Sequence, residues 1–234
     1  MVVPIILAAC FVGVFCLAPL AVYLLWLAGV HRRGRPVPLS GTGDFTALLV
    51  GLAGFLLAGG VVLLTVVQSG FRSWTRGNFL QLRANWDKEH TVWILTLVGY
   101  LLIVIVAAVW SYRRRRKSLV VYNVTLPAVD DAVEAALAGV GRAASRFGHR
   151  WSDATGDVVA VRPFHAMQQV TVTVLAGEPR LAEELDRQLR ATLAVAVPAG
   201  GQIGAWIASA AWSCGLAAIC CFGLLIFYIY LAAG

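Results

Sequence analysis

Four long apolar stretches restrict what this chain can fold into. A helix needs about 20 mostly apolar residues to cross a lipid bilayer. Four stretches reach this length, namely 2–30, 45–67, 91–112 and 203–231, and none of them contains Asp, Glu, Lys or Arg. The sequence therefore predicts a polytopic α-helical membrane protein with four transmembrane helices.

The composition excludes an ordinary soluble protein and a disordered one. Hydrophobic residues make up 59% of the 234 residues and charged residues 13%, whereas an average soluble domain is about 45–50% apolar and about 25% charged. The first apolar stretch is too long for the core of a signal peptide, and no basic residue precedes it. We therefore expect this stretch to be retained as a membrane anchor.

The charges divide the chain into two parts. Residues 118–198 carry seven Arg and nine acidic residues, a net charge of −2, while the remainder carries +9. The basic residues of the remainder stand in short loops beside apolar stretches, which is typical of membrane topology signals and not of a nucleic-acid-binding surface. We predict transmembrane helices one to three with their loops in 1–117, a soluble insert in 118–198, and the last transmembrane helix in 199–234.

The basic residues also predict an orientation. Eight of them follow the first and third apolar stretches, and four lie on the opposite side, in 68–90. Because short cytoplasmic loops carry the excess of Lys and Arg, we expect a cytoplasmic insert and extracytoplasmic termini. The preference for Arg, with many Ala, Val and Gly, suggests a bacterial plasma (inner) membrane. The eight residues, expected to mark topology and to contact lipid headgroups, are Arg32, Arg33, Arg35, Arg113, Arg114, Arg115, Arg116 and Lys117.

The insert has the periodicities of a small α+β domain. Runs rich in β-branched residues predict strands at 119–126, 157–162 and 169–175. Apolar residues at steps of three or four predict one helix from Pro127 to a stop at Gly148, and a second helix that begins at Pro179. Arg142 and Arg146 are expected in the last turns of the first helix, where they suit its dipole.

The order β-α-β-β-α resembles a ferredoxin-like split βαβ topology with its last strand missing. The right-handed crossover rule places the first strand beside the third, which leaves the outer edge of the first strand open. A neighbouring loop or the membrane-proximal linker could cover this edge, or it could pair with another protein or a second copy. On the second helix we expect two ion pairs, Glu183 with Arg187 and Asp186 with Arg190.

Small residues recur at helical spacing in two of the apolar stretches. Such seams let helix backbones approach closely in lipid. They could serve packing within the chain, or association with another membrane protein or with a second copy. The seam residues are Ala47, Gly51, Gly54 and Ala58 in the second stretch, and Gly204, Ala208, Ala211, Gly215 and Ala218 in the fourth.

The segment 68–90 mixes aromatic or aliphatic residues with basic ones. This mixture favours a segment that lies in the headgroup layer, with a docking surface for an extracytoplasmic partner as the alternative. The apolar members are Phe71, Trp74, Phe79, Leu80, Leu82 and Trp86, and the basic members are Arg72, Arg76, Arg83 and Lys88.

No signature of catalysis or of cofactor binding stands in the sequence. The five cysteines lie within the first and fourth apolar stretches without metal-binding spacing, so we expect free thiols, although Cys16 and Cys220 should lie at comparable depths. Four polar residues of the insert match no known ligand spacing, and we expect them to be solvated loop residues. They are His149, Asp153, Asp157 and His165. We therefore assign no catalytic residue, cofactor or metal.

The apolar stretches lack the ionisable groups that proton relays, ion pathways and voltage sensors need at membrane depth. This absence, together with the seams and the open strand edge, favours a non-enzymatic integral membrane scaffold or accessory subunit with a cytoplasmic interaction domain. The alternatives are a regulatory or structural component of a transporter or channel, and a membrane enzyme that uses polar residues of the insert.

Overall fold

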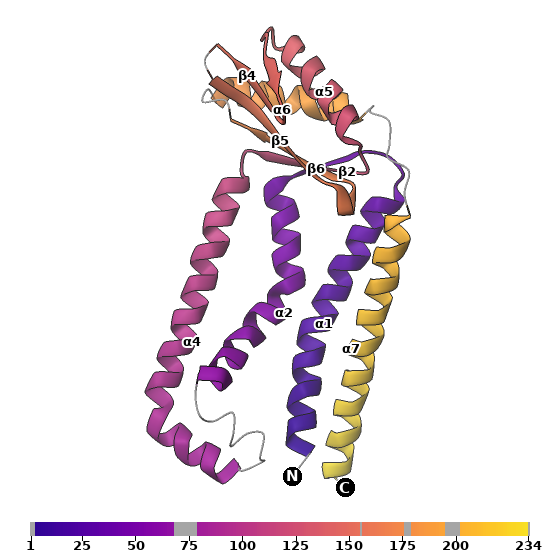
Figure 1. Ribbon diagram of the computed structural model, residues 1–234. Helices are drawn as coiled ribbons and strands as arrows, with labels where there is room; N and C mark the ends of the chain where they lie inside the picture. The colour runs from indigo at the N-terminus through magenta and orange to yellow at the C-terminus, as the bar shows by residue number, and fades with distance from the viewer. Residues whose placement is uncertain (1–2, 68–78, 155, 176–178, 195–201, 234) are drawn as a thin grey trace. The chain divides into compact units, whose positions relative to one another are not determined.

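Four helices of this protein are long and apolar enough to cross a membrane, as the sequence predicts. The structure is a computed structural model that describes residues 3–67, 79–154, 156–175, 179–194 and 202–233. The four helices are α1 (Val3–Arg32), α2 (Gly41–Val67), α4 (Phe79–Arg115) and α7 (Ile203–Ala233), all shown in Figure 1.

Helix α2 begins at Gly41, before the predicted residue 45. The backbone N–H of Gly43 donates to the side-chain oxygen of Ser40 at 3.2 Å, so Ser40 satisfies one of the free donors at the start of the helix. The earlier start places Asp44 inside the helix. An acid in the first turn is favourable because the N-terminus of a helix is partly positive.

Helix α4 also begins early, at Phe79, so residues 79–90 are helical and not a loop as predicted. Of the predicted headgroup-layer segment, residues 68–78 lie outside the described residues. The side chains of the first turns of α4, including those of Trp86 and Lys88, also lie outside the description. The interfacial role of this segment stays a prediction.

The chain forms two compact units. The helical unit consists of Met1–Leu24, Leu49–Trp110 and Ala210–Gly234. The sheet unit consists of Leu25–Leu48 and Ser111–Ser209. The sheet unit is therefore larger than the predicted insert, because it takes in the end of α1, the start of α2 and the end of α4.

The sheet unit contains a six-stranded antiparallel sheet in the order β1-β2-β6-β5-β4-β3. Strand β6 lies between β2 and β5 and is antiparallel to both, so the predicted neighbourhood of the first and third insert strands is confirmed. The strands are β1 (Val37–Ser40), β2 (Ser118–Tyr122), β3 (Ser145–Phe147), β4 (Arg150–Asp153), β5 (Gly156–Phe164) and β6 (Gln169–Val174).

The outer edge of β2 is not open. Strand β1, from the loop between α1 and α2, pairs with it antiparallel from Val37 opposite Tyr122 to Ser40 opposite Leu119. The alternative in which a neighbouring loop covers this edge is therefore confirmed. The alternative in which another chain pairs with this edge is wrong, because β1 already pairs with it.

The first insert helix is shorter than predicted. Helix α5 (Leu126–Gly139) ends where Gly141 adopts a φ of 72°, which glycine does without strain. The N–H of Arg142 donates to the carbonyl of Leu137 at 3.0 Å, and the N–H of Gly141 to Ala138 at 2.9 Å. This pair of bonds is the Schellman motif that ends many helices.

The residues after this helix end form a β-hairpin that the sequence analysis missed. Strands β3 and β4 pair around Gly148, whose φ of 63° marks a turn and not a helix stop. Arg142 and Arg146 are therefore not helical: Arg142 pairs with Asp153 at 2.8 Å, and Arg146 with Asp130 of α5 at 2.6 Å. One ion pair joins the hairpin to the first half of α5, and the other joins it to the residues that follow this helix.

One face of the sheet forms the core against α5 and α6 (Pro179–Ala194), which lie together on that side in Figure 1. Helix α6 has the predicted start. The ion pair of Asp186 with Arg190 is confirmed at 2.8 Å, but Arg187 pairs with Glu184 and not with Glu183. Fully buried core side chains include Leu119, Val121, Val129, Val133, Val159, Val161, Val172, Leu185, Leu189 and Leu193.

Candidate functional site

The sheet unit holds a group of polar side chains, buried except for one half-buried arginine, where the ends of three helices meet β2. We call this group the junction cluster. Its members come from α1, α2, α4, β2 and the residue after β2, and are His31, Asp44, Arg115, Tyr122 and Asn123.

Asn123 connects the end of α1 to the sheet. Its side-chain N–H groups donate to the carbonyls of Val30 at 3.0 Å and Arg35 at 3.2 Å. Val30 lies in the last turn of α1, where helix carbonyls lack partners within the helix. Asn123 also has a φ of 59°, a left-handed conformation that Asn tolerates better than most residues. It therefore ends β2 and caps α1 at once.

His31 completes the hydrogen bonding of Asn123. The Nδ1 atom of His31 lies 2.8 Å from Oδ1 of Asn123. Because an amide oxygen only accepts, Nδ1 carries the proton. The Nε2 atom of His31 is buried without a hydrogen-bond partner among the described residues. The ring also stands edge-on to the ring of Tyr122, with centroids 5.4 Å apart.

Asp44 joins α2 to the same strand. The hydroxyl of Tyr122 donates to one carboxylate oxygen of Asp44 at 2.5 Å. A guanidinium nitrogen of Arg115 lies 3.8 Å from the other oxygen. The Arg115 guanidinium also lies over the ring of Phe45, 4.8 Å from its centroid. The cluster thus connects the first turn of α2, the last turn of α4 and β2 through one buried carboxylate.

Gly41 explains how these elements come so close. A methyl group added at Gly41 would overlap the side-chain oxygen of Ser118 and lie 2.9 Å from the carbonyl oxygens of Arg115 and Ser118. The start of α2 therefore lies directly against the α4–β2 corner. Only a residue without a side chain fits at this position.

The four polar residues of the insert that were considered as metal ligands do not form a metal site. The two Asp side chains are paired with other residues, and the two His side chains are exposed. Asp153 is paired with Arg142, and Asp157 with Arg150 and Ser152. His149 lies exposed in the β3–β4 turn, and His165 is exposed after β5. Among the described residues, no group of three or more His, Cys, Asp or Glu side chains is arranged to hold a metal.

The pKa values of two carboxyls in the sheet unit, Asp130 and Asp157, are shifted in opposite directions. Burial raises the pKa of Asp130, and the guanidinium of Arg146 opposes this shift. The hydroxyl of Ser152, 2.6 Å away, and then the guanidinium of Arg150 lower the pKa of the exposed Asp157. The contacts of Asp157 thus stabilise its charged form.

We expect a measurable pH dependence from Asp157. A carboxyl with a lowered pKa stabilises the folded state above the ordinary Asp value of about 4, and this contribution is lost as the pH falls through the lowered value. Acidification from neutral pH to below this range should therefore lower the melting temperature less in Asp157→Asn than in the natural protein. In Ser152→Ala, the decrease in melting temperature should lie between those of the natural protein and Asp157→Asn, because only one of the two groups that lower the Asp157 pKa is removed. An equal decrease in all three proteins would contradict the expectation.

The seam residues lie at helix contacts within each unit. In the helical unit, a methyl group at Gly54 would overlap the carbonyl of Phe15, and one at Gly51 would lie 2.6 Å from Cβ of Tyr23, so both face α1. In the sheet unit, a methyl group added at Gly204 would lie 3.1 Å from Cβ of His31. Ala208, Ala211 and Ala218 are buried, while Ala47, Ala58 and Gly215 are half-buried. The three glycines named first thus serve contacts within this chain.

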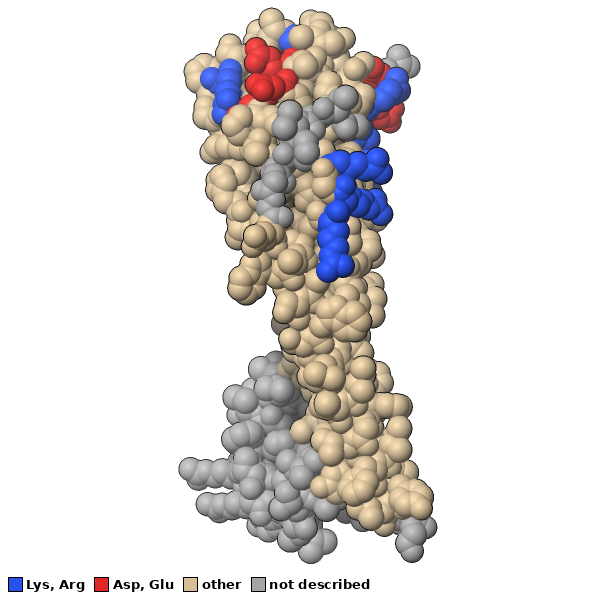
Figure 2. All heavy atoms as spheres, turned by 90° about the vertical axis from the view of Figure 1, so that its right-hand side faces the viewer, with Lys and Arg blue, Asp and Glu red and all other residues tan. Residues whose placement is uncertain are grey.

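The predicted topology residues are mostly exposed. Arg32, Arg33 and Arg35 are exposed, as are Arg113, Arg114, Arg116 and Lys117, whereas Arg115 is half-buried in the junction cluster. Figure 2 shows several Lys and Arg side chains gathered in one group on the surface. All five cysteines are free thiols; Cys16 is buried and Cys220 is exposed.

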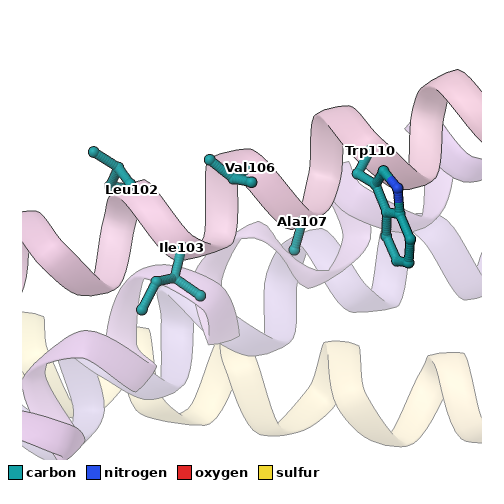
Figure 3. A pocket seen from close by; sticks show the side chains of 5 residues that line it. All are labelled: Leu102, Ile103, Val106, Ala107 and Trp110. Carbon is teal, nitrogen blue, oxygen red and sulfur yellow. The ribbon is translucent and has the colours of Figure 1, made fainter.

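Helix α4 presents an apolar groove in the helical unit. A cavity of about 450 Å³ is lined by side chains of this helix alone, and Figure 3 shows how they follow one another along it. No residue in the most apolar part of the helix, within Ile94–Arg115, is buried. Its contact with α2 includes a bond from the Tyr100 hydroxyl to the Leu56 carbonyl, 2.7 Å long. The lining residues are Leu102, Ile103, Val106, Ala107 and Trp110.

The sequence analysis missed the junction cluster, although two local signals stood in the chain. Asn123 interrupts an apolar run that is otherwise suited to a strand, and Asn is enriched at left-handed positions. His31 stands between an apolar stretch and a pair of arginines. Neither signal identifies the residue with which His31 or Asn123 forms a hydrogen bond.

The chain matches none of the protein-family models, curated proteins or solved structures with which it was compared.

Proposed function

We propose that this protein is a non-enzymatic integral membrane scaffold or accessory subunit, with its sheet unit on the cytoplasmic side of a bacterial inner membrane. The observation that supports this most is that polar side chains of the sheet unit make contacts between its structural elements. His31, Asp44 and Asn123 join helix ends to a strand, and Asp130 and Asp153 join a hairpin to a helix. These groups stabilise joints between elements, which suits a rigid interaction module.

Two surfaces suit interaction with other proteins. The groove of α4 is lined by apolar side chains. No residue in the most apolar part of this helix is buried against the rest of the chain. Strand β3 is an exposed edge, because it pairs on one side only, with β4. A ferredoxin-like topology, which we also propose, is supported by β6 lying antiparallel between β2 and β5.

Photocrosslinking in cells tests the proposal. A photoreactive residue at Ile103 probes the groove, and one at Ser145 probes the β3 edge. We expect one or both to capture a defined protein, identified by mass spectrometry, and we expect the same residue at Glu134, exposed on α5, to capture none. A monomer in mild detergent, without co-purifying protein or crosslinks, would refute the scaffold proposal.

The proposed orientation has its own test. A reporter fused after Lys117 should show a cytoplasmic signal, because five consecutive basic residues immediately precede β2 and such clusters stay on the cytoplasmic side. A reporter placed in 68–78 should show the opposite signal. The reverse pattern would overturn the orientation.

A second candidate is a regulatory or structural component of a transporter or channel. The junction cluster supports it, since buried contacts connect the sheet to the ends of α1, α2 and α4. A change in the sheet unit would thus reach three helix ends. Flux of ions or solutes into liposomes that contain the purified protein would support this candidate, and a bilayer that stays tight at all protein densities would count against it.

A further inference from the structure

The sheet has a second face, opposite the one that α5 and α6 cover, which we call the lower face. Residues directly opposite each other on paired strands point to the same side of a sheet. The register therefore puts Tyr122, Gln169 and Phe164 in one row of the lower face. Val120, Thr171 and Arg162 form a second row.

A third row extends the lower face to the far edge of the sheet. It consists of Ser118, Thr173, Ala160, Arg150 and Phe147. Burial changes along the rows: on β2, Val120 and Tyr122 are buried and Ser118 is half-buried, whereas the side chains on β5, β4 and β3 are largely exposed. Half of the lower face is thus covered and half is open.

The helix ends cover the buried half. Tyr122 on the lower face bonds to Asp44 of α2 and contacts the His31 ring of α1. The same helices continue from these contacts into the apolar spans. The open half therefore belongs to the same face of the sheet that these helix ends contact.

The open half combines aromatic and basic side chains. Phe147 is 71% exposed and Phe164 is 54% exposed, although large apolar side chains in a soluble domain are usually buried. Arg162 is exposed and has no ion pair with a described residue, while Arg150 pairs with Asp157. A cavity of about 380 Å³ lies between these arginines, with His149, Ala160, Val161 and Pro163 in its lining.

The geometry points to the open half of the lower face as a binding surface for anionic phospholipid headgroups. The two phenylalanines enter the interface, where aromatic rings are favoured. Arg162 and Arg150 bind phosphate at the mouth of the cavity, because the cytoplasmic leaflet attracts basic groups near its surface. This inference rests on the proposal that the helices cross a membrane, and adds a second, peripheral attachment of the sheet unit.

The test uses the full chain in nanodiscs of phosphatidylcholine alone or of phosphatidylcholine with phosphatidylglycerol. A photoreactive residue at Phe164 should give lipid adducts by mass spectrometry, mostly with phosphatidylglycerol, and one at Phe147 should give the same result. Arg162→Glu should lower the adduct yield at position 164 by about fivefold or more, as expected for loss of one surface arginine. The matched control is Arg187→Glu, at an exposed position of α6 away from the sheet's lower face. It should leave the adduct yield at position 164 unchanged.

Each other outcome overturns the assignment. Equal adducts in both nanodiscs would remove the role of anionic headgroups. Folded protein without lipid adducts at 147 and 164 would remove the surface altogether. Crosslinks from these positions to a second copy or to another protein would also overturn it, while the scaffold proposal would remain, since that proposal is tested at Ile103 and Ser145.

Discussion

Replacing Gly54 with alanine is expected to destabilise the helical unit by about 1–3 kcal/mol or more, the range in which overpacking of tight contacts falls. The added methyl group would overlap the carbonyl oxygen of Phe15 and lie 2.6 Å from Cα of Cys16. These atoms belong to the backbone of α1 and cannot rotate away as a side chain could. The two helices must separate, so the neighbouring seam contact at Gly51 is lost as well.

The measurement is the thermal unfolding midpoint of the purified protein in mild detergent. Gly99→Ala is a matched control, because it makes the same change on α4 where an added methyl group meets no atom within 4 Å. Alanine has a higher helix propensity than glycine by about 1 kcal/mol, so the control should be neutral or slightly stabilising. Equal midpoints for the two variants would show that α1 and α2 do not pack at Gly54.

Much of the fold could be predicted because its signals are local. Apolar length fixes the four long helices, and strict alternation in 169–175 identifies β6. Strand β1 carries no such signal: it has four residues, one of them Pro38, and it is a strand because β2 offers a free edge about eighty residues later. The β3–β4 hairpin was missed because both strands are short, and because Ala144 and Phe147 continue the apolar spacing of the preceding helix as far as Gly148.

The candidate site depends even more on distance along the chain. His31 and Asn123 are 92 residues apart, and Asp44 and Tyr122 are 78 apart. In the sequence, His31 directly follows an apolar stretch, and Asn123 is a polar residue within an otherwise mostly apolar predicted strand. Their pairing follows only once β1 aligns with β2 and brings the end of α1 to the end of that strand.

Asn123→Ala is expected to have the other large effect, a loss of about 3–5 kcal/mol of unfolding free energy. A buried group left without a partner costs about 1–3 kcal/mol, and the change removes one hydrogen bond each from the Val30 and Arg35 carbonyls and from His31 Nδ1. The Val30 carbonyl still accepts from the N–H of Arg33 at 3.4 Å. Alanine in the left-handed conformation adds roughly 1–2 kcal/mol. Denaturant unfolding, followed by a probe in the sheet unit, measures the sum.

Asn123→Gly separates the two causes, because glycine keeps the left-handed backbone without strain but makes none of the side-chain bonds. It should lose less stability than Asn123→Ala, by the roughly 1–2 kcal/mol of backbone strain. Combined with His31→Ala it should show a coupling of about 0.5–3 kcal/mol, the range for residues in one hydrogen-bond network. If Asn123→Ala changed stability by less than about 0.5 kcal/mol, as surface substitutions do, Asn123 would not hold α1 to the sheet. In that case the proposed transmission from the sheet to the helix ends would lose its main connection.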